Sequence, residues 1–141
     1  MIGERVELGE GATYLHYTSN NTIYGTQLRA HPTLSDPSTP LVIDASSDVL
    51  SRPLDLSRCA LVYAGAQKNA GPAGVTLVVI RKSLLAQCST LAPMFSYKVQ
   101  ADKHSVYNTP PVFPIYVVGL VLDWIAAEEE ARQRQQVQKL V

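Results

Sequence analysis

The chain has 141 residues, of which 46% are hydrophobic and 17% are charged. This composition excludes a disordered chain and suffices for one domain with a packed core. Twelve basic and twelve acidic side chains cancel to a net charge of zero, so the sequence gives no electrostatic reason to expect binding to nucleic acid or to a membrane surface.

The two cysteines, Cys59 and Cys88, do not have the spacing of a metal site. Cys59 lies in an apolar run, which favours buried, reduced thiols over a disulfide. Residues 1–11 are too charged for a secretory signal, and the apolar stretch 112–125 is shorter than the roughly 20 residues that span a bilayer. We therefore expect a cytoplasmic protein without a metal site or a membrane segment.

The first part of the chain predicts two strands joined by a proline-rich connection. Residues 14–17 alternate weakly and predict a strand, and the polar cluster 18–22 predicts a turn. Three prolines between residues 29 and 40 predict a surface connection without a regular element, in which His31 is expected to be exposed. Leu41-Val-Ile43 has the pattern of a buried parallel strand. Functional crevices commonly lie at the carboxyl ends of such strands.

A glycine-rich loop at residues 64–74 lies between two apolar runs. Cys59–Tyr63 and Val75–Ile80 each predict a buried strand, and the second run is rich in β-branched residues. The glycines permit positive φ angles and close backbone approach, while Pro72 stiffens the loop. This loop is therefore suited to holding Lys68 in one place at the end of a strand.

Lys68 and Asp44 are the residues whose chemistry is most suggestive. A lysine amine forms Schiff bases with carbonyl compounds or with pyridoxal phosphate (PLP), although most lysines are simply solvated. An aspartate is a usual partner for the PLP ring nitrogen, although Asp44 is equally suited to cap a helix. Because Asp44 ends one predicted strand and Lys68 follows the next, we favour the roles at a cofactor. Arg52 is expected to pair with Asp48 or Asp55.

The second part of the chain predicts mainly helices. Residues 82–87 predict a short helix, and Pro110 and Pro111 place Asn108 and Thr109 on a stiff turn. Apolar residues at helical spacing over 112–125 leave little polar face, which predicts a largely buried helix. Residues 126–141 predict a charged helical tail. We therefore divide the chain into a main part, residues 1–125, and the tail 126–141.

Four motifs carry a resemblance to a known family: Asp44-Ala-Ser-Ser-Asp48, Leu50-Ser-Arg-Pro53, Lys68 with its flanks, and Tyr107-Asn-Thr-Pro-Pro111. From about residue 14 to residue 124 the chain resembles phosphoserine aminotransferase, a PLP-dependent enzyme of fold type I. The resemblance implies part of an α/β large domain, with an open, mainly parallel sheet and flanking helices. It also implies a cytoplasmic homodimer of serine biosynthesis, which transfers an amino group between glutamate and 3-phosphohydroxypyruvate.

The resemblance also implies the residues of the site. Lys68 is the implied catalytic residue and binds the cofactor covalently. Thr22 is implied near the ring hydroxyl, Asp44 at the ring nitrogen and Gln67 at the phosphate. Asn108 and Thr109 are implied to reach the phosphate of the neighbouring subunit's cofactor.

Two alternatives stay open. Family enzymes are much longer, so the chain is also consistent with a truncated, catalytically inactive fragment that acts at most as a structural or dimerisation module. A different fold-type-I enzyme, such as a lyase or a desulfurase, is the other alternative, because an aspartate and a lysine specify the cofactor rather than the reaction. The Ser-Arg-Pro and Asn-Thr-Pro-Pro motifs argue against this second alternative.

Overall fold

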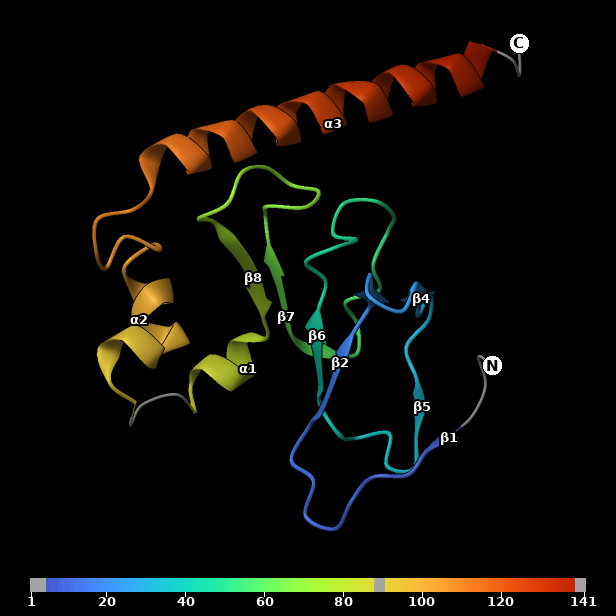
Figure 1. Cartoon of the computed structure of the whole chain (residues 1–141), viewed down its shortest axis with the longest axis vertical. Coiled ribbons are helices and arrows are strands. Elements are labelled where there is room, and N and C mark those ends of the chain that lie inside the picture. The colour runs from blue at the N-terminus through green and yellow to red at the C-terminus, as the bar shows by residue number, and fades with distance from the viewer. Residues whose placement is uncertain (1–4, 88–90, 139–141) are drawn as a thin grey trace.

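The computed structural model describes residues 5–87 and 91–138, so that Cys88 lies outside the described residues. A four-stranded sheet forms the centre of a mixed α/β arrangement, with strand order β2-β6-β7-β8 (Figure 1). The strands are β2 (Leu15–Thr18), β6 (Leu41–Asp44), β7 (Cys59–Gly65) and β8 (Thr76–Ile80). The first three are parallel, and β8 runs antiparallel to β7, which confirms the prediction of a mainly parallel sheet.

Shorter elements surround this sheet. β1 (Arg5–Val6) pairs in parallel with β5 (Thr33–Leu34), and β3 (Asn20–Asn21) pairs with β4 (Thr26–Gln27) in a hairpin. The helices are α1 (Lys82–Leu85), the 3-10 helix η1 (Pro93–Phe95), α2 (Tyr97–Asp102) and α3 (Val112–Gln138). The prediction that the connection 29–40 has no regular element is wrong, because it contains β5. Leu34 of β5 is only 3% exposed, and its burial holds this segment in place.

The core lies under β6 and β7, where aliphatic side chains point inward. Leu41 and Ile43 are fully buried, and the free thiol of Cys59 is buried as expected. Ile43 packs in a cluster with Ala45, Cys59, Val62 and Ala64. Burying a side chain such as Ile43 stabilises the fold by about 1.5–3 kcal/mol, so this cluster holds the two central strands in place.

Strand β8 departs from the prediction. Its run of β-branched residues was expected to form a buried strand, yet Val78 and Val79 are 39% and 53% exposed. The strand lies at the edge of the sheet, with β7 as its neighbour. β-branched residues favour an extended backbone, but burial depends on what packs against each face, which the local pattern does not specify.

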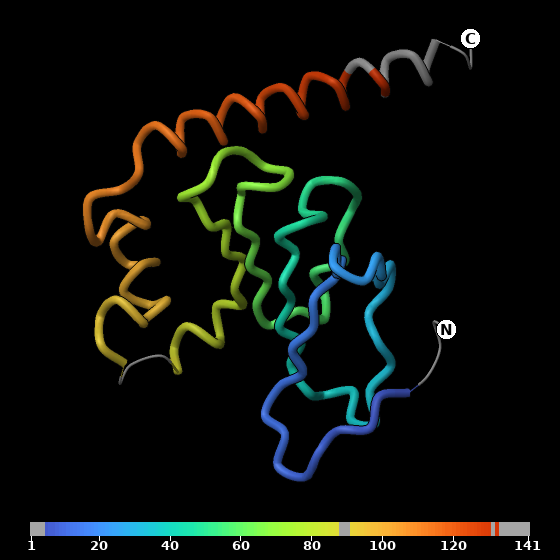
Figure 2. The backbone as a smooth tube through the Cα atoms, viewed as in Figure 1, coloured from blue at the N-terminus to red at the C-terminus, as the bar shows by residue number. Residues whose placement is uncertain are grey.

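Helix α3 crosses the loop between β7 and β8 (Figure 2). Val118 is 5% exposed and packs against Ala66 and Ala70 of that loop. A Cβ atom on Gly71 would lie 2.7 Å from Val118 Cγ2, so the helix approaches this closely only because Gly71 has no side chain. The helix therefore fixes the loop that carries Lys68.

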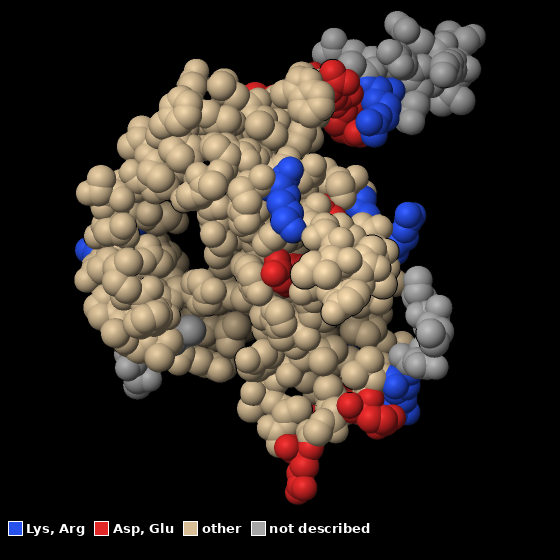
Figure 3. Space-filling view, in the orientation of Figure 1, with Lys and Arg blue, Asp and Glu red and all other residues tan. Residues whose placement is uncertain are grey.

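The expectation that residues 112–125 form a largely buried helix is wrong. Phe113, Tyr116 and Trp124 are 71%, 61% and 63% exposed, and the first half of α3 is largely uncharged on the face drawn in Figure 3. Apolar residues lie all around this helix, while the loop covers only the side that carries Val118. The helix continues unbroken through Ile125 to Gln138. Among the described residues, no helix has the length and apolarity needed to cross a membrane.

Candidate active site

The carboxyl ends of β2 and β6 meet the turn after β7 around a pocket of about 210 Å³. Three of the predicted site residues line it: Thr22, Asp44 and Lys68. The other lining residues are mostly polar: Thr18, Asn20, Asn21, Ile23, Ser46 and Ser47. Because parallel strands end at the same edge of a sheet, residues distant in the chain converge here.

Lys68 reaches this pocket from a loop that is closed by backbone hydrogen bonds. The amides of Ala70 and Gly71 both donate to the Ala66 carbonyl, at 3.0 and 2.9 Å. Asn69 Nδ2 donates to the Val49 carbonyl at 2.7 Å and ties the loop to the segment after β6. From this base Lys68 Nζ donates to Thr22 Oγ1 at 3.2 Å. The amine therefore has a defined position, although the lysine is exposed.

Asp44 is half-buried at the last position of β6. Its Oδ1 accepts hydrogen bonds from the backbone amide and the hydroxyl of Ser46, at 2.9 and 2.6 Å. Its backbone carbonyl accepts from the Ser19 amide at 2.9 Å. The carboxylate is thus held at the pocket edge by a local turn. Residues 46–50 form turns and not a helix, so Asp44 does not act as a helix cap there.

Tyr63 lies opposite Asp44 in the register of β6 and β7 and was not predicted from the sequence. Burial raises the pKa of its phenol, and the negative charge of Asp44 raises it further. The phenol oxygen lies 3.0 Å from His16 Nε2, and the two rings stack with centroids 6.0 Å apart. Tyr63 is therefore a protonated neighbour of the Asp44 carboxylate.

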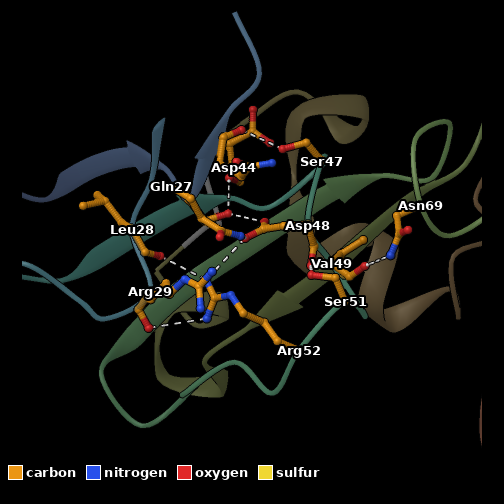
Figure 4. A network of polar contacts seen from close by, with 12 residues as sticks. Gln27, Leu28, Arg29, Asp44, Ser47, Asp48, Val49, Ser51, Arg52 and Asn69 are labelled. Atoms are coloured by element: carbon orange, nitrogen blue, oxygen red, sulfur yellow. Dashed lines mark hydrogen bonds and ion pairs between the residues drawn. The ribbon is translucent and has the colours of Figure 1, made fainter. Parts of the chain in front are cut away.

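The hairpin that carries Thr22 is held at its base by a buried polar network (Figure 4). Asp48 accepts hydrogen bonds from Ser19 Oγ, from Gln27 Nε2 at 3.3 Å and from Arg52 Nη2 at 3.3 Å. Arg52 Nη2 also donates to the Leu28 carbonyl at 3.0 Å. The predicted pairing of Arg52 with Asp48 is confirmed. The network connects β2, β4 and the segment after β6.

The remaining predicted residues do not line the pocket. Gln67 is exposed, and its side chain lies directly against Gly65. Asn108 and Thr109 are exposed on the turn before α3, where Asn108 Nδ2 donates to the Thr109 carbonyl at 3.4 Å. Within one chain, the structure therefore brings together three of the six predicted cofactor-binding residues.

A second cluster was missed because His31 was expected to be exposed. Its side chain is only 10% exposed, with Nδ1 lying 2.7 Å from the Tyr17 hydroxyl and Nε2 2.7 Å from the Asp55 carbonyl. Burial is the main cause that raises the pKa of Tyr17 to about 12. No local sequence signal connects these residues, since the contact depends on how the connection 29–40 folds back.

The comparisons with known proteins agree on one family. The model of the aminotransferase class-V family matches residues 5–141. A phosphoserine aminotransferase of Lysinibacillus sphaericus is 52% identical over 121 residues, which cover 85% of this chain and 33% of that protein. One from Laribacter hongkongensis is 55% identical over 115 residues, which cover 81% and 31%.

Solved structures show the same relationship. The phosphoserine aminotransferase of Bacillus circulans subspecies alkalophilus superimposes with a TM-score of 0.80 and 48% identity, covering 94% of this chain and 36% of that one. A PLP-bound phosphoserine aminotransferase of Trichomonas vaginalis gives a TM-score of 0.78 at 36% identity, covering 86% and 35%. The chain thus spans about a third of the length of the relatives that it matches.

Proposed function

Because this chain belongs to the aminotransferase class-V family, we propose that it forms the lysine- and aspartate-bearing part of a phosphoserine aminotransferase that uses PLP. The observation that carries the proposal is the convergence of Thr22, Asp44 and Lys68 on one pocket. The names of the relatives support the reaction, since those quoted above are phosphoserine aminotransferases. A lyase or a desulfurase finds no such support among them.

The side chains around the pocket fit this cofactor. Lys68 supplies an amine for its carbonyl group, Asp44 a carboxylate for its ring nitrogen and Thr22 a hydroxyl for its ring oxygen. The bond from Lys68 Nζ to Thr22 Oγ1 shows that the first and last of these groups already lie close together. When bound, PLP supplies an electron sink that stabilises negative charge at the substrate α-carbon.

Each side chain then has a defined role. Lys68 Nζ would hold the cofactor through its carbonyl group and, once released by the substrate amine, would take a proton from the α-carbon of an amino-acid substrate. Asp44 maintains a proton on the ring nitrogen by placing a negative charge beside it. Thr22 orients the lysine amine through its hydroxyl. The Ser19–Asp48 network keeps the Thr22 hairpin in place while these steps occur.

We propose glutamate and 3-phosphohydroxypyruvate as the substrates, in a cytoplasmic pathway to serine. Both substrates carry at least two anionic groups, whereas Lys68 is the one cation among the residues that line the pocket. Binding of these groups therefore requires further cationic side chains from outside this pocket lining.

We also propose that Asn108 and Thr109 serve the cofactor of a second copy of the chain. They are exposed and lie outside their own pocket, at the start of the helix with the exposed apolar side chains Phe113 and Tyr116. A mixing experiment tests this. Lys68→Ala and Asn108→Ala chains should each retain little cofactor. Their mixture should regain binding, because a mixed dimer has one site that combines Lys68 of the Asn108→Ala chain with Asn108 of the Lys68→Ala chain. A mixture that stays at the level of the separate variants contradicts the dimer proposal.

Covalent cofactor retention is the direct test of the main proposal. The chain is incubated with PLP, reduced with borohydride and digested, and the modified lysine is located by mass spectrometry. We expect modification at Lys68, its loss in Lys68→Ala, and no change in Lys103→Ala, which removes another exposed lysine. Equal modification of many lysines, or unchanged retention in Lys68→Ala, contradicts the proposal.

A further inference from the structure

Ser46 connects the Asp44 carboxylate to the neighbouring strand. Its backbone amide and its hydroxyl both donate to Asp44 Oδ1, at 2.9 and 2.6 Å. The same hydroxyl oxygen accepts a hydrogen bond from the backbone amide of Gly65 at 3.0 Å. Gly65 is the last residue of β7, and Asp44 is the last residue of β6. One hydroxyl group therefore bridges the ends of two adjacent strands.

A second copy of the same local turn shows which hydrogen bonds of Ser46 belong to the turn and which one bridges the two strands. Ser38 donates from its amide and its hydroxyl to Asp36 Oδ1, at 2.9 and 2.7 Å. These bonds stabilise a turn in the surface connection, and they lower the pKa of Asp36, the side-chain bond being the larger cause. Ser46 makes the same two bonds and accepts the Gly65 amide in addition. A local turn therefore explains the first two bonds of Ser46 but not the third.

Gly65, at one end of this bridge, comes directly before the loop that carries Lys68. Gly65 closes β7, and the next residue, Ala66, begins the hydrogen-bonded loop that carries the lysine. Gln67 lies so close to Gly65 that a Cβ atom there would collide with it. The hydrogen bond to Ser46 thus ties the Gly65 backbone at the point where the Lys68 loop begins.

We propose that Ser46 is a positioning residue that sets the Asp44 carboxylate in place relative to the origin of the Lys68 loop. The inference rests on the proposed function, because it concerns how the two ends of the cofactor are held. The carboxylate receives two hydrogen bonds at one oxygen, which fixes its orientation toward the pocket. The hydroxyl transmits that orientation to β7 through its bond with Gly65.

Ser46→Ala tests the proposal in the full chain, with Ser38→Ala as the matched control. Without cofactor, hydrogen exchange of the Gly65 amide should be at least about tenfold faster in Ser46→Ala and unchanged in Ser38→Ala, because only Ser46→Ala removes the acceptor of the Gly65 amide. With cofactor, Ser46→Ala should bind PLP about tenfold more weakly. The ring nitrogen of bound ¹⁵N-labelled PLP should lose its proton at a pH about one unit lower.

The outcomes separate the possible failures. Ser46→Thr keeps the hydroxyl and should restore all three readouts. The ring-nitrogen titration is the readout that a merely structural role of Ser46 would not change. If Ser46→Ala does not fold, Ser46→Cys takes its place in the comparison with Ser46→Thr. Normal PLP uptake by wild type with unchanged uptake and ring-nitrogen titration in Ser46→Ala overturns the role of Ser46 alone. A wild-type chain that takes up no PLP overturns the proposed function and this role with it.

Discussion

Lys68 Nζ donates a hydrogen bond to Thr22 Oγ1 across 3.2 Å, although 46 positions separate the two residues in the chain. One lies in the loop after β7 and the other in the β3–β4 hairpin. Their contact requires the order of the sheet strands, the closed Lys68 loop and the buried base of the hairpin to be correct together. The bond therefore reports on the assembly of the whole site.

Replacing Thr22 with valine removes the hydroxyl and keeps the shape of the side chain. We expect PLP binding to weaken about three- to tenfold, the usual effect of one exposed or half-exposed hydrogen bond. Titration of the cofactor absorbance measures the change. Thr26→Val on the same hairpin, also exposed, is the control and should bind normally. Equal affinities of wild type and Thr22→Val would remove Thr22 from the site.

The local pattern of residues suffices to predict this site only in part. Asp44 and Lys68 are predictable because each follows an apolar strand and stands at a turn, and both signals lie within a few residues. Tyr63 and Ser46 are not predictable in the same way, since their roles arise from the register of β6 against β7. Their side chains become neighbours of the site only after two strands pair.

Asp48 allows a stability prediction for the base of the hairpin. Its side chain is 6% exposed and is paired with Arg52, whose side chain is 25% exposed. Asp48→Ala should lower the free energy of unfolding by about 3 kcal/mol, because it leaves a partly buried guanidinium without its counter-charge. Urea denaturation measures the loss. Asp123→Ala, which replaces an exposed aspartate within α3, should leave stability unchanged or slightly higher. Similar values for the two variants would contradict the structural role of Asp48.

Alanine substitutions at two glycines should have opposite effects on stability, which tests the contact of α3 with the Lys68 loop. Gly71→Ala places a Cβ atom 2.7 Å from Val118 Cγ2 and should destabilise the fold by about 1–3 kcal/mol. Gly119→Ala adds a methyl group in open space within a helix and should stabilise it by up to about 1 kcal/mol. Thermal unfolding of both variants distinguishes these effects. Val118→Ala in the Gly71→Ala background should recover part of the loss, and no recovery would argue against the contact.

Burial is where prediction from sequence is weakest, and helix α3 and His31 show why. An apolar helix is normally covered, but here one loop covers a single side of it, leaving Trp124 63% exposed. A histidine in a proline-rich connection is normally exposed, but the connection folds back so that the His31 side chain is only 10% exposed and lies 2.7 Å from the Tyr17 hydroxyl. In both cases the neighbours decide the outcome, and the neighbours are distant in the chain.

Tyr17 gives the chain a predictable weakness at alkaline pH. Its pKa in the folded state is raised to about 12, mainly by burial, whereas an unfolded tyrosine titrates near 10. A raised pKa means that the stabilising contribution is complete below about pH 10 and is lost as the pH rises from there through about 12. Urea unfolding should therefore show a free-energy loss of about 1 kcal/mol between pH 8 and pH 11, allowing for partial exposure. Tyr17→Phe should remove the part of this slope that Tyr17 contributes and leave the part that comes from the raised pKa values of Cys59 and Tyr63. It should also start about 1 kcal/mol lower, because the bond to His31 is lost. Tyr24→Phe, at a residue 79% exposed, should keep the wild-type slope, and an unchanged slope in Tyr17→Phe would contradict the assignment.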